Sequence, residues 1–251
     1  MKAHIITIGD ELLIGQVVDT NSAWMAQRLD GIGVKTIQIT SVQDQASQIL
    51  ETVGMAVSQC DVVLITGGLG PTKDDITKST LARFFNDELV VHQPTLENIE
   101  ELFKRRGLEM TELNMRQAMV PASCKVIHNA LGTAPGMWFE KNGTIIVSMP
   151  GVPFEMKNIM EEYVLPQLSQ MINGRFIIHK TILTNGIGES FLSDMISNWE
   201  DELPQYMHLA YLPSPGMVRL RLTGTGEHKP SLQLAMNTEI EKLQNIIPQY
   251  I

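Results

Sequence analysis

Glycine, proline and aspartate are concentrated in one short segment that follows an apolar run. Residues 64–77 read LITGGLGPTKDDIT, in which Gly67, Gly68 and Gly70 precede Thr72. Glycines let the main chain approach an anion closely, and amides at the start of a helix point toward it. The segment therefore predicts a phosphate-binding loop, although it matches neither a Walker A sequence nor a dinucleotide fingerprint. A sharp turn that ends in a helix cap is the alternative.

Two aspartates follow this loop directly. Asp75 alone suffices as a cap, which is worth about 1 kcal/mol. A phosphate ~4 Å from a carboxylate would be repelled by about 4 kcal/mol at an effective dielectric constant near 20. Phosphate and aspartates can share the site only with a cation between them, which Lys73 supplies singly and a divalent metal doubly. The sequence thus predicts that Asp74 and Asp75 hold a metal.

The flanking pattern alternates strands and helices. Strands are predicted at 3–8, 34–40 and 61–66, and helices at 23–29, around 49–57 and at 76–85. This order predicts a three-layer α/β/α domain with a mostly parallel sheet. Ligands bind at the carboxyl ends of such strands. Asp10, Glu11 and Asp44 follow the first two strands, so we expect them to complete the metal shell beside the glycine loop, although each also suits a cap or a solvated position.

Further polar segments follow in the same half of the chain. Helices are predicted at 94–106, 111–119 and 154–170, and a hairpin at 137–148. The loop at 129–136 reads NALGTAPG and either closes over a sugar or base or is an ordinary surface loop. Asn21 is expected to cap a helix in the first place and to contact a ligand only in the second. Glu155 lies in a predicted first helical turn, where an acid is favourable without any chemistry.

The last part of the chain predicts a second domain. A boundary is expected at Asn173 and Gly174, which gives domains of 1–172 and 173–251. Strands at 176–183, 208–212 and 218–222 and helices at 189–199 and 231–247 predict a small α+β fold.

Composition excludes several classes of protein. A formal net charge of −9 and a pI near 5.1 disfavour a broad nucleic-acid surface. Cys60 and Cys124 are too few for a disulfide framework, which suggests a reducing, cytoplasmic environment, and no segment reaches a membrane-spanning length. The histidines lack zinc-ligand spacing, and no Gly-x-Ser-x-Gly elbow is present.

The ordered motifs of the chain resemble the CinA (competence/damage-inducible protein A) family. The matching segments of the first domain resemble the molybdopterin-binding fold of the MogA and MoaB proteins, and Gly186–Ser190 and Tyr211–Gly216 resemble the KH-like domain that follows in that family. The segments in the first domain are Gly9–Leu13, Asp19–Asn21, Thr66–Thr77, Gly132–Gly136 and Pro150–Met156.

The resemblance implies an ADP-ribose pyrophosphatase that yields AMP and ribose 5-phosphate. It implies a divalent metal (Mg²⁺, Co²⁺ or Mn²⁺), a monovalent ion such as K⁺, and a homodimer. Asp44 and Asp75 match two aspartates that matter in the molybdopterin enzymes, although Gln43 stands where the family more often has glycine. Alternatives are molybdopterin binding or adenylation, and a non-enzymatic nucleotide or nucleic-acid binding module; Gly186-Ile187-Gly188 does not form the GXXG clamp of RNA-binding KH domains.

Together these observations assign candidate roles. The catalytic residues are Asp75, Asp44 and Lys73, and the metal ligands are Asp74, Asp75, Asp10 and Glu11. The predicted contacts to a small nucleotide substrate are Gly67, Gly68, Gly70, Thr72, Asn21, Gly132, Thr133, Gly136 and Gly151.

Overall fold

A computed structural model describes residues 1–172, 174 and 176–251 of the chain. The chain divides into two compact units. One comprises Met1–Asp30 and Val34–Met171, and the other comprises Ile172–Ile251, with the short segment Gly31–Gly33 grouped with it. The predicted boundary residue Asn173 lies outside the described residues.

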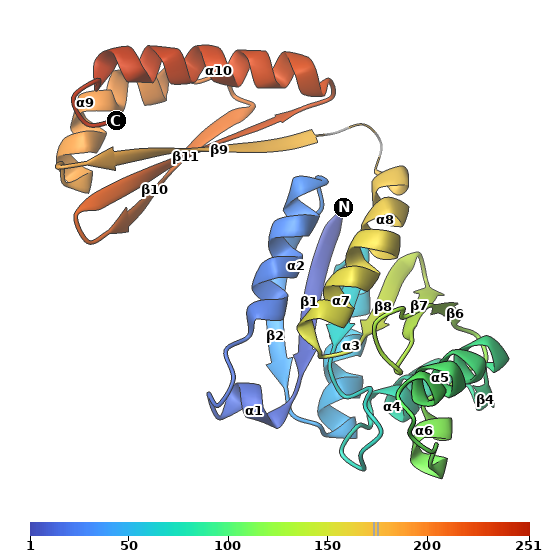
Figure 1. The fold of residues 1–251 in the computed structure, drawn as a ribbon. Coiled ribbons are helices and arrows are strands. Elements are labelled where there is room, and N and C mark those ends of the chain that lie inside the picture. Colours follow the sequence, from blue (N-terminus) through green and yellow to red (C-terminus); the bar gives the residue numbers. More distant parts are fainter. Residues whose placement is uncertain (173, 175) are drawn as a thin grey trace. The chain divides into compact units, whose positions relative to one another are not determined.

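The first unit alternates strands and helices along most of its length (Figure 1). It contains β1 (Lys2–Ile8), α1 (Asp10–Leu13), α2 (Thr20–Gly31), β2 (Lys35–Val42), α3 (Ala46–Gln59), β3 (Val62–Thr66), α4 (Thr77–Phe85), β4 (Leu89–Val91), α5 (Gln93–Arg105), α6 (Glu112–Arg116), β5 (Met119–Pro121), β6 (Lys125–Ile127), β7 (Gly136–Lys141), β8 (Thr144–Met149) and α7 (Pro153–Ile159). A π-helical turn at Met160–Val164 joins α7 to α8 (Leu165–Met171) without a break.

The central sheet of this unit has the strand order β2-β1-β3-β8-β7-β6. Strands β2, β1, β3 and β8 run parallel, while β7 and β6 are antiparallel. The β7–β8 hairpin turns through Asn142 and Gly143, which both have positive φ, as the Asn-Gly sequence predicts. The predicted α/β fold with a mostly parallel sheet is confirmed.

Helices cover both faces of the sheet, which explains why β1 and β3 are almost continuously apolar. On one face Ile49, Val53 and Ala56 of α3 pack with Leu81 of α4 against Ile6 and the adjoining strands. Helices α2 and α7 lie on the other face (Figure 1). Both faces of the sheet are therefore covered by helices. The loops at the strand ends are the part of the sheet that a ligand could reach.

The second unit is a smaller α+β domain. It contains β9 (Phe176–Asn185), α9 (Glu189–Asp201), β10 (Met207–Ser214), β11 (Met217–Gly226) and α10 (Lys229–Ile246). Its antiparallel sheet has the order β10-β11-β9. Leu192, Ile196 and Trp199 of α9 share a buried cluster with Met236 and Leu243 of α10, so both helices enclose the same core. The predicted strands and helices of this domain all occur.

The helix predicted at 111–119 is the clearest difference. Helix α6 begins at Glu112 under a capping box formed by Thr111 and Asn114, but it ends at Arg116. Met119 instead starts β5, which pairs with β4 in a two-stranded sheet. Pairing with a distant strand overrides the local helical pattern here. Elements α1, β4, β5 and β6 were not predicted; each has three or four residues.

None of the helices in the described part of the chain is both long enough and apolar enough to cross a membrane.

Candidate functional site

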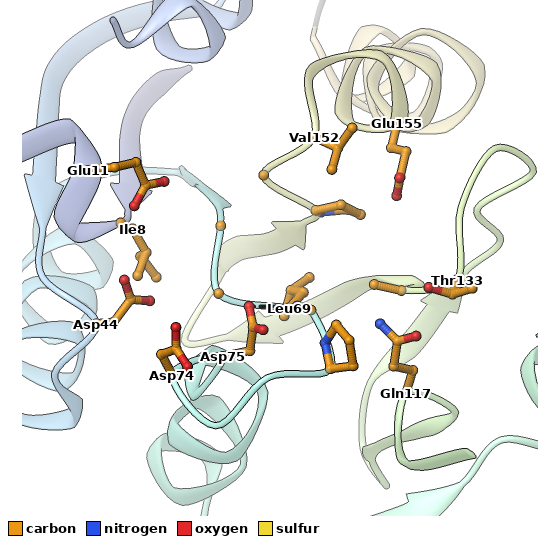
Figure 2. Close-up of a pocket in the computed structure, with 18 residues that line it drawn as sticks. Ile8, Glu11, Asp44, Leu69, Asp74, Asp75, Gln117, Thr133, Val152 and Glu155 are labelled. Atoms are coloured by element: carbon orange, nitrogen blue, oxygen red, sulfur yellow. Dashed lines mark hydrogen bonds between the residues drawn. The ribbon is translucent and has the colours of Figure 1, made fainter. Parts of the chain in front are cut away.

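The carboxyl ends of β1, β2, β3 and β8 meet at one edge of the sheet, where a cavity of about 400 Å³ opens (Figure 2). The sequence places loops at this edge after each strand, and the parallel arrangement brings them together. Its lining comprises Ile8, Gly9, Glu11, Asp44, Gly67, Gly68, Leu69, Gly70, Pro71, Asp74, Asp75, Gln117, Thr133, Ala134, Pro150, Gly151, Val152 and Glu155. We call this the acidic cavity.

Close packing of main chains explains two glycines of the site. Gly67 has a φ of +111°, and a β-carbon there would lie 2.1 Å from the carbonyl oxygen of Ile8. A β-carbon at Gly151 would lie 3.3 Å from the Cα of Gly67. Thr66 reinforces the contact because its hydroxyl donates to the Pro150 carbonyl at 2.7 Å. The loops after β3 and β8 therefore pack backbone against backbone.

Asp75 holds the glycine loop closed. Its Oδ1 accepts from the Gly70 amide at 2.8 Å, and its Oδ2 accepts from the Thr72 amide at 2.9 Å and from the Thr72 hydroxyl. These bonds explain the position of Asp75, which is five residues after the Gly70 donor and three residues after the Thr72 donor. The amides of Gly68 and Leu69 donate to no acceptor among the described residues. Both residues line the cavity, Gly68 half-buried and Leu69 almost fully buried.

Asp44 follows β2 and lies beside the glycine loop (Figure 2), where its Oδ1 would be 3.3 Å from a β-carbon at Gly68. Its Oδ2 accepts from the Asp10 amide at 3.3 Å. Burial raises the pKa of the Asp44 carboxyl, and the charges of Asp10, Glu11 and Asp75 raise it further, against the lowering effect of the Asp10 amide. Asp44 is thus a more basic carboxylate than usual, held where like charges converge.

The acidic cavity concentrates carboxylates, and the described residues that line it include no cation. Its carboxylates come from α1, the loop after β2, the glycine loop and α7, and they belong to Glu11, Asp44, Asp74, Asp75 and Glu155. Among the described residues that line it, none is Lys, Arg or His, and none of those acids forms an ion pair with any described residue. Such a concentration of negative charge favours a bound cation.

Two predicted residues lie on the other side of the glycine loop. Lys73 and Thr72 line a separate cavity of about 280 Å³, which we call the basic cavity. Lys78 of α4 lines it too, and its ammonium donates to the carbonyls of Gln117 at 2.9 Å and Arg116 at 3.4 Å. Burial lowers the pKa of Lys78 to about 8. Lys73 therefore shares a cavity with Asp75 but does not line the cavity that holds the other carboxylates.

The segment at 129–136 is a fixed loop rather than an open one. Asn129 donates to the Ala134 carbonyl at 2.9 Å and to Glu155 at 2.7 Å, and its Oδ1 accepts from the Gly132 amide at 3.1 Å. A β-carbon at Gly132 would lie 2.1 Å from the Glu155 carboxylate. Glu155 therefore anchors this loop from the first turn of α7, as well as lining the acidic cavity.

Within this loop, Thr133 and Ala134 line the acidic cavity, whereas Gly132 and Gly136 do not. Gly136 starts β7, where a β-carbon would lie 3.1 Å from the Cβ of Ile127, so its small size serves packing.

Asn21 lies in the first turn of α2 and joins that helix to the loop after β8. Its amide group donates to the Gly151 carbonyl at 2.8 Å, while its Oδ1 is buried without a partner among the described residues. The helix itself is capped by Asp19, whose Oδ1 accepts from the Ser22 amide at 2.9 Å. Asn21 lines a small adjoining cavity of about 120 Å³ together with Glu11, Gly67 and Gly151.

The predicted metal ligands are only partly gathered. Glu11, Asp44, Asp74 and Asp75 face the acidic cavity, but Asp10 contributes its amide rather than a lining side chain. Within the described residues, no three His, Cys, Asp or Glu side chains come close enough to hold an ion by themselves. A hard cation at this place would have one or two carboxylates as protein ligands and would need water or substrate phosphate oxygens for the rest.

Sequence reasoning missed several residues of the two cavities. Gln117 and Arg116 reach the site from α6 through tertiary packing, and no local signal marks them. Lys78 follows the glycine motif at 64–77 directly and lies in the first turn of α4. Its position could have identified it, because a cation at the start of the helix that follows a predicted phosphate-binding loop lies close to that loop.

The α/β fold with polar residues at its strand ends agrees with one class of domain, and a family model identifies that class. Residues 4–170 match the family model described as "Probable molybdopterin binding domain". Residues 179–251 match the model described as "Damage-inducible protein CinA KH domain".

The chain belongs to the CinA-like protein family. It is 49% identical over 255 residues to a CinA-like protein of Flavobacterium psychrophilum, an alignment that covers 100% of this chain and 60% of the relative. It is 47% identical over 249 residues to a CinA-like protein of Cytophaga hutchinsonii, covering 99% of this chain and 60% of that protein. The chain thus spans 60% of the length of these relatives.

The chain is also similar to a solved structure. The protein CinA with unknown function from Thermoplasma acidophilum is 31% identical, with a TM-score of 0.61, over 67% of this chain and 97% of that one.

Proposed function

We propose that this protein hydrolyses the diphosphate bond of ADP-ribose, or of a related nucleoside-diphosphate sugar, with the help of a divalent metal. The observation that carries the proposal is the acidic cavity, where an open-amide glycine loop and uncompensated carboxylates line one space. Amides bind phosphate, and carboxylates bind the metal that accompanies phosphate. Phosphate-binding amides and carboxylates would repel each other's ligands in one cavity unless a metal accompanied the phosphate, so their presence together favours a metal-bound diphosphate.

The glycine loop binds the diphosphate through its main chain. The Gly68 and Leu69 amides are the unused donors of the loop that belong to its glycine-rich first half. Asp75 keeps them in place because it fixes the residues immediately downstream. Thr133 and Val152 line the same cavity, where they are positioned to contact the sugar or base of the nucleotide.

The carboxylates divide into two roles. Asp74 and Glu11 are exposed in the cavity and are the side chains that would hold the metal. When bound, Mg²⁺, Co²⁺ or Mn²⁺ would neutralise phosphate charge and lower the pKa of a ligated water. Asp75 acts mainly through the loop, because both of its oxygens already accept hydrogen bonds. A monovalent ion such as K⁺ belongs to the same proposal.

Asp44 is the group best suited to accept a proton. Its pKa is raised by burial and by neighbouring acids, which makes its carboxylate a stronger base. In the proposed reaction a water oxygen forms a bond to one phosphorus, its proton passes to Asp44, and the bond from that phosphorus to the bridging oxygen breaks. The products are AMP and ribose 5-phosphate.

The direct test is to incubate the protein with ADP-ribose and a series of divalent ions and to measure AMP by chromatography. We expect AMP to appear only with a divalent ion, and Asp44→Asn to lower its rate by about tenfold or more. Asp30→Asn, which changes an acid on α2 that lines neither cavity, serves as the control. Turnover without a metal, or equal rates for both variants, would contradict the proposal.

The description of the matched family model favours one second candidate, which is pterin binding or adenylation in molybdenum-cofactor synthesis. The acidic cavity would then bind a pterin phosphate with the same loop. Co-purification of a pterin, or activity with ATP and molybdopterin but none with ADP-ribose, would select it.

A further inference from the structure

The glycine loop separates two cavities of opposite charge. The acidic and basic cavities share the walls Leu69, Gly70, Pro71, Asp75 and Gln117. One side of this wall presents carboxylates without a cation among its described lining residues, and the other presents Lys73, Lys78 and Arg116. A chain with a formal net charge of −9 therefore gathers three cations next to its proposed site.

The single acid of the basic cavity is already engaged. Asp75 is its sole carboxylate among the described lining residues, and that carboxylate accepts bonds from Gly70 and Thr72. The lining thus has a formal charge of +2 at pH 7, from three cations and one acid. A phosphate monoester carries a charge of about −2 at that pH, so the two balance.

Lys78 is built into this cavity more firmly than a surface lysine. Its ammonium is held by the Arg116 and Gln117 carbonyls at the end of α6. An ammonium has three N–H donors, so one is left for a ligand. Burial lowers the pKa of Lys78 to about 8, and an anion beside it would offset the cost of burying its charge. Arg116 extends from the same helical end and adds a planar group that suits phosphate.

We propose that the basic cavity binds the phosphate group that leaves during hydrolysis, with Lys78 and Arg116 as its main contacts and Lys73 at its rim. The assignment to the leaving phosphate rests on the proposed function; binding of a phosphate monoester does not. As the bond from phosphorus to the bridging oxygen breaks, the departing phosphate gains negative charge. Cations that meet this charge stabilise the transition state.

The alternative is that Lys78 only caps the end of α6 and that Lys73 and Arg116 are solvated side chains. Arg116→Gln distinguishes these cases, because the Arg116 side chain is exposed and its backbone carbonyl, which Lys78 uses, is unchanged. Arg106→Gln is the matched control, since Arg106 is an exposed arginine that lines neither cavity.

The experiment measures binding of ribose 5-phosphate by isothermal titration calorimetry with a chelator present, so that no metal can recruit phosphate to the acidic cavity. We expect the wild-type protein, Asp44→Asn and Arg106→Gln to bind with similar affinity. Arg116→Gln should bind about tenfold more weakly or worse. Inorganic phosphate in place of ribose 5-phosphate should give the same order of affinities among these proteins, because the phosphate is the group recognised.

Three results would overturn the proposal: no binding to the wild-type protein, equal binding by Arg116→Gln and Arg106→Gln, or a loss in Asp44→Asn as large as in Arg116→Gln. If ADP-ribose is not hydrolysed but ribose 5-phosphate binds as expected, the proposed function fails and the anion site stands. If hydrolysis occurs, Arg116→Gln should also lower kcat, which a solvated arginine would not do.

Discussion

The two units of this chain differ in where their loops gather. In the first unit four parallel strands end at the same edge, and the segments that follow them supply Glu11, Asp44, Asp75 and Gly151 to one cavity. In the second unit three antiparallel strands alternate in direction, so loops from neighbouring strands leave at opposite ends.

The glycines show the same contrast. A β-carbon at Gly67 or Gly68 would collide with the main chain or with Thr77, whereas at Gly186 and Gly216, which also have positive φ, it would meet no atom within 4 Å. Gly67 and Gly68 are therefore restricted by neighbours in space as well as by φ, whereas Gly186 and Gly216 are restricted by backbone conformation alone. The two crowded glycines lie directly after β3, where the strand ends form the acidic cavity.

Gly67→Ala should produce the largest effect. Besides the positive φ, which costs about 1 kcal/mol or more, the new methyl group would overlap the Ile8 carbonyl and add an overpacking cost of about 1–3 kcal/mol. We expect loss of AMP release and a lower melting temperature of the first unit. Gly186→Ala has open space around it, so it should lower the free energy of unfolding only by the cost of its positive φ. Calorimetry of both variants checks the contrast, and equal destabilisation would refute it.

Asp75→Asn should have the next largest effect. The amide retains one acceptor oxygen where the carboxylate used both, and hydrogen bonds to a charged group are worth about 1.5–3 kcal/mol. Turnover of ADP-ribose should fall by about tenfold or more while circular dichroism remains unchanged. Asp194→Asn on α9 in the second unit is the control and should keep full activity. Unchanged turnover in Asp75→Asn would remove this residue from the mechanism.

His4 should make the stability of the first unit sensitive to acid. It is buried in β1, its Nε2 lies 2.9 Å from the Thr40 hydroxyl, and burial lowers its pKa below the ordinary 6.5. The unfolded chain then binds more protons than the folded one just below pH 6.5, so the free energy of unfolding falls as the pH drops through that region. His4→Gln should flatten this dependence in denaturant titrations of the first unit. A profile unchanged by the substitution would contradict this account.

Removing the second unit should have the smallest effect on chemistry. A chain that ends at Met171 retains every lining residue of the acidic and basic cavities. We therefore expect it to fold and to release AMP at a rate within about threefold of the full chain, a difference below 1 kcal/mol. A much larger loss would show that the second unit contributes to the site.

Much of the fold could be predicted because its signals are local. The alternation of apolar strands and helices identified the parallel sheet, and Asn142-Gly143 identified the hairpin. Elements of three or four residues, such as β4 and β5, escaped because they depend on pairing between distant segments. The acids at the strand ends could also be predicted, because each directly follows a strand that local sequence identifies. Arg116 and Gln117 could not, since only tertiary packing brings α6 to the loop.

The bonds from Gly70 and Thr72 to Asp75 close six residues into a small ring without any ligand. A loop already held in one shape loses little conformational entropy when an anion arrives. Binding at the Gly68 and Leu69 amides next to this ring should therefore resemble filling a preformed receptor rather than folding a flexible segment around its target. Association should then be limited by the diffusion of the nucleotide into the cavity rather than by rearrangement of the protein.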